Sequence, residues 1–398
     1  MKTEIYITGA GAASAIGMNR QQTLDALING RSGVEAVRYL QTAHSELPVG
    51  EVKRSNDELR EMLDIPPSEA FIRSSLLAIP AVREAMAQAR LETGVPVRVA
   101  FLSGITVGGM DQSERRYNDF LTNNSENAYI RLSDCGACTE QIADYIGGFH
   151  SVSTIVTACS SSANTLMLGA DMIRTGRADI VVAGGTECLS RYHVNGFNTL
   201  MILDREVCKP FDRDRAGINL GEGAGYVVLE TAATASKRDV LPLARLSGYS
   251  NVCDAYHPTA SSPDGIGAYL AMRGAIEDAG LKPEDIDYVN AHGTGTPNND
   301  LTEGLAAMRL FTDGVPPLSS IKAFTGHTTS AAGGFEAVVA LLAIEHNFLP
   351  VNLNFRRRIE EHNFSPVTDP SPPHPVRHVL SNSFGFGGND SSIVISKI

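Results

Sequence analysis

Short runs of β-branched and other apolar residues alternate along the chain with longer segments whose apolar positions recur at helical spacing. The runs predict strands at residues 5–8, 98–102, 153–156, 180–183, 225–229, 288–290, 318–321 and 392–395. The longer segments predict helices, for example at residues 163–175, 267–279 and 331–345. This alternation is typical of an α/β fold with mostly buried strands.

The length of the chain, 398 residues, is too great for one ordinary hydrophobic core. We predict a break within residues 232–243, which divides the chain into halves of residues 1–240 and 241–398. Because no linker rich in Pro, Gly and Ser lies there, the two halves should pack closely. The Pro-rich segment 365–375 is expected to form a surface loop.

Composition excludes several classes of function. The net charge of −12 argues against nucleic acid as the main partner, because no general basic field would attract phosphates. No run approaches the roughly 18 consecutive apolar residues of a membrane span, and the N-terminus shows no export signal. Six cysteines in a chain of this length do not make a disulfide scaffold, so we expect reduced thiols and a cytoplasmic protein.

Two short motifs have simpler interpretations than a ligand site. Residues 9–14, GAGAAS, approach a dinucleotide-binding fingerprint, but the third small position is Ser14 and no acidic residue ends a second strand about 20 residues later. A tight strand-to-helix turn is the better interpretation. Cys135 and Cys138 form a C-x-x-C with no second pair to complete a metal set, so we interpret them as packing residues and predict no metal.

The strongest local pattern surrounds Cys159. A β-branched strand runs into a turn of small residues that carries this cysteine, and a helical segment follows. A thiol at a helix N-terminus lies near unpaired N–H groups and the positive end of the helix dipole, which favour a thiolate. The backbone N–H of Cys159 is then free to help hold an oxyanion. A lone cysteine at a strand end is more often a small buried hydrophobe, so a nucleophile needs partners.

Partners occur in the second half of the chain. His292 follows a predicted strand in a turn rich in Gly and Thr, and Lys322 and His327 follow the next strand. A Gly-rich loop with two aromatic residues, Phe384 and Phe386, precedes the last strand. Polar residues at three strand ends, each followed by a Gly-containing turn, are hard to explain by packing alone.

At these residues the sequence resembles the β-ketoacyl-acyl-carrier-protein synthases of the thiolase superfamily. The motifs that carry the resemblance are TACSSS at 157–162, KPFDRDR at 209–215, GEGAG at 221–225, DAYHPT at 254–259, HGTGT at 292–296, Lys322 with Gly326 and His327, and GFGG at 385–388. The resemblance covers nearly the whole chain. It implies a thiolase-like, five-layered α-β-α-β-α fold built of two similar halves, and usually a homodimer.

The motifs also distinguish close relatives. Synthases that start chains from coenzyme A esters use Cys, His and Asn, whereas Lys322 and His327 stand here in place of the Asn pattern. Thiolases place a second cysteine in the C-terminal Gly-rich loop, and residues 384–389 contain none. Inactive partner subunits lack the nucleophile that Cys159 provides. All three comparisons favour an active elongating synthase, an acyltransferase.

The resemblance implies decarboxylative Claisen condensation of an acyl-enzyme thioester with malonyl-acyl-carrier protein, giving β-ketoacyl-acyl-carrier protein and carbon dioxide in fatty acid biosynthesis. Residues 293–300 look nearer to ketosynthases of aryl-polyene or polyketide pathways, which leaves that alternative open, including a heterodimer with a Cys-less homologue. A third hypothesis makes malonyl decarboxylation or chain initiation the main activity.

The resemblance also implies roles for individual residues. Cys159 carries the acyl group, while His292 and His327 bind the malonyl thioester carbonyl and stabilise the enolate. Lys322 acts as a fixed charge that Glu336 orients. The backbone N–H groups of Cys159 and Phe386 hold the tetrahedral oxyanion.

Further residues follow from the same comparison. Phe386 is expected to be a mobile gate over Cys159, with freedom supplied by the glycines around it, Gly385, Gly387 and Gly388. The expected supporting residues are Phe384, Thr294, Thr296 and Asp300. The expected docking residues for an acidic acyl carrier protein are Lys209 and Arg213, with the run 356–358 as runner-up. No cofactor is expected, because the substrates are carried on the phosphopantetheine of that protein.

Overall fold

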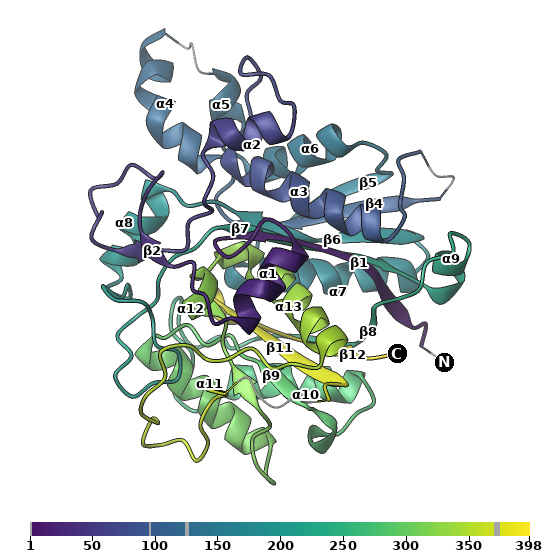
Figure 1. The fold of residues 1–398 in the computed structure, drawn as a ribbon, viewed down its shortest axis with the longest axis vertical. Coiled ribbons are helices and arrows are strands. Elements are labelled where there is room, and N and C mark those ends of the chain that lie inside the picture. The colour runs from purple at the N-terminus through teal and green to yellow at the C-terminus, as the bar shows by residue number, and fades with distance from the viewer. Residues whose placement is uncertain (1, 95–96, 124–126, 370–374) are drawn as a thin grey trace.

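The computed structural model describes residues 2–94, 97–123, 127–369 and 375–398 (Figure 1). Residues 370–374 of the predicted Pro-rich loop lie outside the described residues. The strands are β1 (Ile5–Ser14), β2 (Glu35–Ala36), β3 (Pro48–Val49), β4 (Val99–Gly104), β5 (Ser151–Ile155), β6 (Ile180–Glu187), β7 (Gly223–Glu230), β8 (Ala244–Cys253), β9 (Tyr288–Asn290), β10 (Leu318–Ser319), β11 (His378–Gly385) and β12 (Asn389–Ser396).

Helices connect most of these strands. They are α1 (Arg20–Ile28), α2 (Asn56–Met62), α3 (Arg73–Gln88), α4 (Met110–Asn123), α5 (Asn127–Arg131), α6 (Cys135–Ile146), α7 (Ser161–Arg174), α8 (Arg191–Thr199), α9 (Ala232–Ser236), α10 (Ile266–Asp278), α11 (Pro297–Leu310), α12 (Lys322–Thr325) and α13 (Ala332–His346). Short 3-10 turns are η1 (Ala158–Ser160), η2 (Pro283–Asp285), η3 (Thr329–Ala331) and η4 (Phe386–Gly388). In the described part of the chain, no helix combines the length and apolarity that crossing a bilayer requires.

The strand order repeats itself on either side of the centre of the sheet. Within the described residues the order is β10-β9-β11-β12-β8-β1-β7-β6-β4-β5. Strands β4, β5 and β6 are parallel, and so are β9, β10 and β11, while β1, β7, β8 and β12 pair antiparallel with their neighbours. Strands β1 and β8 pair only at their first residues, Ile5 with Leu246 through Ile7 with Ala244. Two halves of the same topology therefore meet at this junction.

The helices fall into three layers around the two parts of the sheet (Figure 1). Helix α3 packs on β1, β6 and β7, and α6 packs beside it. Helices α7 and α13 contact each other and strands of both halves, so they form the middle layer. Helix α10 covers β8, β11 and β12 on the other side, with α11 against it. The fold is the predicted thiolase-like α-β-α-β-α arrangement.

The prediction of a turn at residues 9–14 is wrong, because all six residues belong to β1. The two glycines serve close packing instead. A Cβ atom at Gly9 would lie 2.0 Å from the carbonyl oxygen of Ala85, and one at Gly11 would lie 2.0 Å from that of Ala81. Helix α3 therefore packs directly against the backbone of β1, which only residues without a side chain allow.

Candidate active site

Cys159 lies at the start of the central helix α7, in the turn η1 that follows β5. The preceding residue, Ala158, has a φ of 51°, in the left-handed region that side-chain-bearing residues rarely occupy. The backbone before the helix is therefore strained at the point where it presents the thiol. The end of β11 packs against the same turn, since a Cβ at Gly385 would lie 3.3 Å from the Cys159 nitrogen.

Two imidazoles face this thiol. The Nε2 atom of His327 lies 2.9 Å from the Sγ atom of Cys159. The ring of His292 lies 5.2 Å from the ring of His327, centre to centre, at an angle of 85°. His292 follows β9 and His327 follows α12, so both come from the C-terminal half, whereas the thiol comes from the N-terminal half.

The thiol itself is nearly inaccessible, with 5% of Cys159 exposed. Burial raises its pKa to about 11, although the N–H of Phe386, the charge of Lys322 and its own N–H act in the opposite direction. The helix N-terminus therefore does not suffice to ionise the resting thiol. A base must accept its proton as the nucleophile forms, and the Nε2 atom of His327 is within reach.

Both imidazoles are neutral. Burial, followed by the charge of Lys322, lowers the pKa of His292 and the pKa of His327 well below the usual value. Within the described residues, the Nδ1 atom of neither ring has a hydrogen-bond partner. A neutral imidazole offers one N–H and one free nitrogen, so each ring can donate to a carbonyl oxygen or accept a proton.

Lys322 and Glu336 form a buried ion pair behind the two histidines. The Nζ atom of Lys322 donates to the Oε1 atom of Glu336 across 2.6 Å, and each residue is 1% exposed. Burial raises the pKa of Glu336, while Lys322 lowers it. The structure thus pairs the two residues that the sequence predicted as partners. Neither lines the cavity described below.

Two carboxylates on α11 hold the turn that carries His292. Glu303 accepts the backbone N–H groups of His292 at 2.9 Å and Gly293 at 2.8 Å, and Asp300 accepts that of Gly295 at 3.1 Å. Burial raises the pKa of Glu303 to about 7. Sequence reasoning found Asp300 but missed Glu303. The available signal was the three-residue spacing of the two acids, which places them on one helix face.

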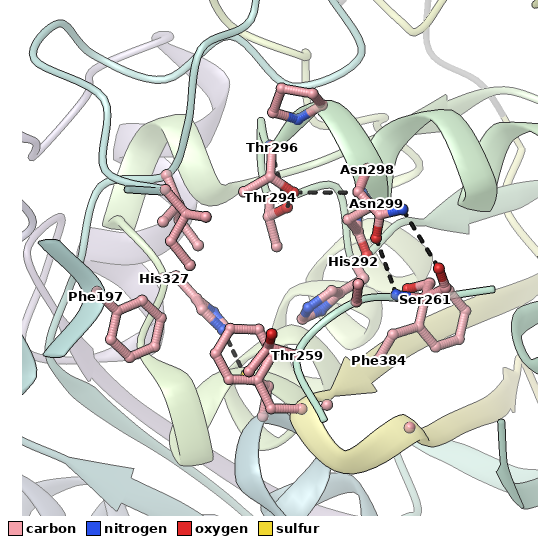
Figure 2. Close-up of a pocket in the computed structure, with 18 of the residues that line it drawn as sticks. Phe197, Thr259, Ser261, His292, Thr294, Thr296, Asn298, Asn299, His327 and Phe384 are labelled. Atoms are coloured by element: carbon pink, nitrogen blue, oxygen red, sulfur yellow. Dashed lines mark hydrogen bonds between the residues drawn. The ribbon is translucent and has the colours of Figure 1, made fainter. Parts of the chain in front are cut away.

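A cavity of about 370 Å³ opens beside the thiol (Figure 2). Figure 2 shows His292 and His327 pointing into it, with Phe197 and Phe384 on opposite sides of the view. Nine of the predicted site residues line it, namely Cys159, His292, Thr294, Thr296, His327, Phe384, Gly385, Phe386 and Gly388. The predicted gate residue Phe386 stacks on Phe197 of α8, with ring centres 5.7 Å apart and an interplanar angle of 18°. Sequence reasoning missed Phe197.

The thiol and the imidazoles also form a set of metal-ligating atoms. One atom each of Cys159, His292 and His327 lies within 4.8 Å of the others, and all three residues are buried. One sulfur and two nitrogens suit a zinc ion with an open fourth position. Any ion held there would occupy the place where a substrate carbonyl must approach the thiol.

The predicted docking residues are not among those that line the cavity. Lys209 pairs with Glu206 at 2.5 Å, and Arg213 pairs with Glu360 at 3.0 Å. In the runner-up segment 356–358, Arg357 pairs with Asp214. Acidic residues of the chain itself therefore compete for these cations.

Two sequence-family profiles match the chain: the Beta-ketoacyl synthase N-terminal domain over residues 2–235, and the C-terminal domain over residues 243–356. The 3-oxoacyl-[acyl-carrier-protein] synthase 2 of Staphylococcus aureus (strain COL) is 30% identical over 407 aligned residues, covering 99% of this chain and 98% of the relative. The protein of the same name from Coxiella burnetii (strain RSA 493 / Nine Mile phase I) is 31% identical over 415 residues, covering 100% and 99%.

Solved structures give the same picture. The ishigamide ketosynthase/chain length factor superposes with a TM-score of 0.91 at 30% identity, over 100% of both chains. A ketosynthase in complex with its chain length factor from Xenorhabdus doucetiae gives a TM-score of 0.84 at 29% identity, over 100% of this chain and 98% of the other.

Proposed function

Because this chain belongs to the β-ketoacyl synthase family, we propose that it condenses an acyl group held on Cys159 with malonyl-acyl-carrier protein, releasing β-ketoacyl-acyl-carrier protein and carbon dioxide. The observation that carries the proposal is the convergence of one thiol and two neutral imidazoles on one cavity, with 2.9 Å between the Cys159 sulfur and the nearer ring nitrogen. Fatty acid elongation is the leading pathway, in line with the relatives named 3-oxoacyl-[acyl-carrier-protein] synthase 2.

The first step loads the enzyme. The thiol proton of Cys159 passes to the Nε2 atom of His327 while the sulfur attacks the thioester carbonyl of acyl-acyl-carrier protein. The N–H groups of Cys159 and Phe386 hold the oxyanion. Collapse of the tetrahedral intermediate breaks the bond to the carrier sulfur, which leaves as a thiol with the proton from His327. The acyl group stays on Cys159 as a thioester.

The second step forms the carbon–carbon bond. His292 and His327 donate N–H groups to the thioester carbonyl of malonyl-acyl-carrier protein, and the electrons of the bond to its carboxylate form an enolate as carbon dioxide leaves. For His327 this requires the tautomer with its proton on Nε2, which exchange with water between the steps provides. The enolate carbon attacks the acyl carbonyl, the Cys159 thiolate departs, and it takes up a proton from solvent water.

The buried ion pair of Lys322 and Glu336 supports both steps although neither residue lines the cavity. Burial, and after it the charge of Lys322, lowers the pKa of both imidazoles, so their N–H groups act as hydrogen-bond donors to an enolate without protonating it outright. Glu336 balances that charge at 2.6 Å. Thr294 and Thr296 line the cavity together with Thr259 and Ser261, and their hydroxyl groups suit the amides of a phosphopantetheine arm.

The protein partners are an acyl carrier protein and a second subunit. Strand β5 is the last in the sheet order, and Val152 on it and Val156 just after it are 37% and 55% exposed. An exposed sheet edge of this kind is a template for pairing with another chain, so we propose a homodimer through β5. For the acidic carrier, Lys209 and Arg213 would exchange their present acidic partners for those of the carrier. All six cysteines are free, in keeping with a cytoplasmic location.

The test of this function is intact-protein mass spectrometry after mixing with acyl-acyl-carrier proteins of several chain lengths. The native chain should gain one acyl mass, and Cys159→Ala should gain none. The variants His292→Ala and Lys322→Met should still be acylated but release no carbon dioxide from malonyl-acyl-carrier protein. Absence of any acyl gain on the native chain would contradict self-sufficient loading.

A second candidate is a polyene- or polyketide-type ketosynthase that works with a Cys-less partner subunit. It is favoured by the TM-score of 0.91 to the ishigamide ketosynthase/chain length factor. Purification of this chain alone, followed by measurement of its mass in solution and its condensing activity, separates the two candidates. An active homodimer supports the first, while an inactive chain that gains activity with a co-expressed Cys-less homologue supports the second.

A further inference from the structure

Two aspartates lie beside the gate loop, residues 385–388 around Phe386. Neither takes part in the chemistry above. Asp390 lies on β12, two residues after η4, and Asp254 follows β8. They approach each other over Gly267 at the first turn of α10. A Cβ at Gly267 would lie 2.3 Å from the Oδ2 atom of Asp390 and 3.0 Å from the Cγ atom of Asp254. The bare glycine backbone provides the space in which the two carboxyl groups sit together.

The surroundings of the pair disfavour two negative charges. Asp390 is 4% exposed, and within the described residues no salt bridge reaches either aspartate. Burial, followed by the charges of Asp254 and Glu303, raises the pKa of Asp390 to about 8. Two features oppose this: the N-terminus of α10, which favours negative charge at its first turn, and the N–H of Ser262, which donates to Asp254. At neutral pH the Asp390 carboxyl therefore holds a proton.

The pair is joined to the gate through the backbone. The N–H of Asp254 donates to the carbonyl oxygen of Gly388 at 2.8 Å, and the N–H of Gly387 donates to that of Pro258 at 2.7 Å. These bonds tie residues 254–258 to η4, whose first residue, Phe386, carries an N–H beside the Cys159 sulfur. One oxygen of Asp254, Oδ1, is buried without a hydrogen-bond partner in the described part of the chain, although Oδ2 accepts the N–H of Ser262 at 2.7 Å.

We propose that Asp254 and Asp390 form a proton-sharing latch, which holds residues 254–262 against the gate loop while one proton is present and releases them when it is lost. With the proton, the carboxyl of one residue can donate to a carboxylate oxygen of the other. Without it, two like charges face each other at close range and repel. Gate position, and through it the placement of the Phe386 N–H, therefore depends on pH. This consequence for catalysis rests on the proposed function, but the latch itself does not.

Fluorescence reports the latch independently of catalysis, because the chain contains no tryptophan. Tyr256 is 56% exposed and lies within residues 254–262, so Tyr256→Trp places a single reporter on the moving segment. Emission of this variant should change between pH 6.5 and 9.5 with a midpoint near the pKa of Asp390. The change should disappear in Tyr256→Trp/Asp390→Asn, whose amide is neutral at every pH.

Two further variants complete the test. Asp254→Asn in the reporter background should move the midpoint to lower pH, because one negative neighbour of Asp390 is gone. Asp264→Asn, at an exposed acid between the same segment and α10, should leave the midpoint unchanged. A pH response that persists in Asp390→Asn would come from another group, such as the exposed His257, and would overturn the latch. A midpoint unaffected by Asp254→Asn would overturn it as well, even if Asp390→Asn did not fold.

The outcomes for the latch and for the proposed function are separate. If the native chain failed to gain an acyl mass while the three midpoints behaved as described, the function would be wrong and the latch would stand. If both hold, the ratio of condensing activity of Asp390→Asn to that of the native chain should rise from pH 7 to pH 9.

Discussion

The Lys322–Glu336 pair allows structural and chemical roles to be separated by one set of variants. Lys322→Met removes the ammonium and leaves a carboxyl group that is 1% exposed. Removing one partner of a buried pair costs about 3–5 kcal/mol, because the other charge stays buried alone. The same carboxyl group can avoid this cost by taking up a proton, since burial raises the pKa of Glu336 and Lys322 is what lowers it.

The sign of the pH dependence follows from this. In Lys322→Met, Glu336 has a folded-state pKa above its unfolded value, so its protonation supports the fold at low pH and that support is lost as pH rises. The free energy of unfolding of Lys322→Met should therefore fall from pH 5 towards pH 8, by up to about 1.4 kcal/mol per pH unit. Glu336→Gln leaves a lone buried ammonium and should show the opposite slope. The double variant Lys322→Met/Glu336→Gln should show neither slope.

Urea unfolding at pH 5, 6, 7 and 8 gives the free energy of unfolding of the native chain, the two single variants and the double variant. Arg273→Met serves as the control. Arg273 forms an exposed pair with Glu277 at 3.5 Å, so its loss should cost at most about 0.5 kcal/mol at any of these pH values. The double variant should recover most of the stability but none of the condensing activity. Equal slopes of stability against pH in the two single variants would refute the charges assigned to the pair. Full condensing activity in the double variant would refute the assignment of Lys322 as a charge required by the chemistry.

Three further predictions address the groups around the thiol. Glu303→Ala should lower the free energy of unfolding by about 2–6 kcal/mol in urea titrations, because the buried N–H groups of His292 and its neighbour lose their acceptor at about 1–3 kcal/mol each. Zinc at micromolar concentration should inhibit condensation, and EDTA should restore the activity. Calorimetry should show zinc binding to the native chain and none to Cys159→Ala. Gly385→Ala should slow acylation in stopped-flow assays, because its Cβ would lie 3.0 Å from the carbonyl oxygen of Thr157 and would push β11 away from the nucleophile turn.

Most strands that the sequence predicted contain an unbroken run of apolar residues. Strand β6 reads IVVAGGTE and β9 reads YVN, and each overlaps its prediction. Strands β8 and β11 were not predicted, because ARLSGYSNVC and HVLSNSFG carry polar residues along their length. Their polar positions are satisfied by partners distant in sequence, such as Glu303, whose Oε1 atom accepts an N–H of the Asn382 side chain at 3.0 Å. Such pairing is decided by tertiary contacts that no local pattern contains.

The site shows the same division. Cys159, His292 and His327 were predicted from strand ends and Gly-containing turns, and the structure brings them to one cavity. The resting charge of the thiol was not predictable, because it depends on how completely the two halves bury it. Phe197 was missed for a related reason. Its ring stacks on that of Phe386, which lies 189 positions later in the chain by numbering.

The internal repeat explains why such distant residues meet. In the strand order, β5 and β10 occupy equivalent edge positions, and each leads through a 3-10 turn into a middle-layer helix, α7 or α13. The turns η1 and η3 contact each other, and each holds a residue with left-handed φ, 51° at Ala158 and 45° at Thr329. The same strained entry to a helix therefore occurs twice, and the two helix N-termini meet at the turn that carries Cys159.

The two neighbouring helix N-termini affect whether the site stabilises the resting thiolate or the transition state. Each contributes a partial positive charge of roughly half an elementary charge at its first turn. At rest these charges do not ionise Cys159, because burial outweighs them and keeps its pKa near 11. During the reaction, the negative charge that appears on the thioester oxygen in the tetrahedral intermediate, and on the enolate, develops inside the same buried cavity. Fixed dipoles there stabilise the transition state more than the ground state, which is the condition for faster chemistry.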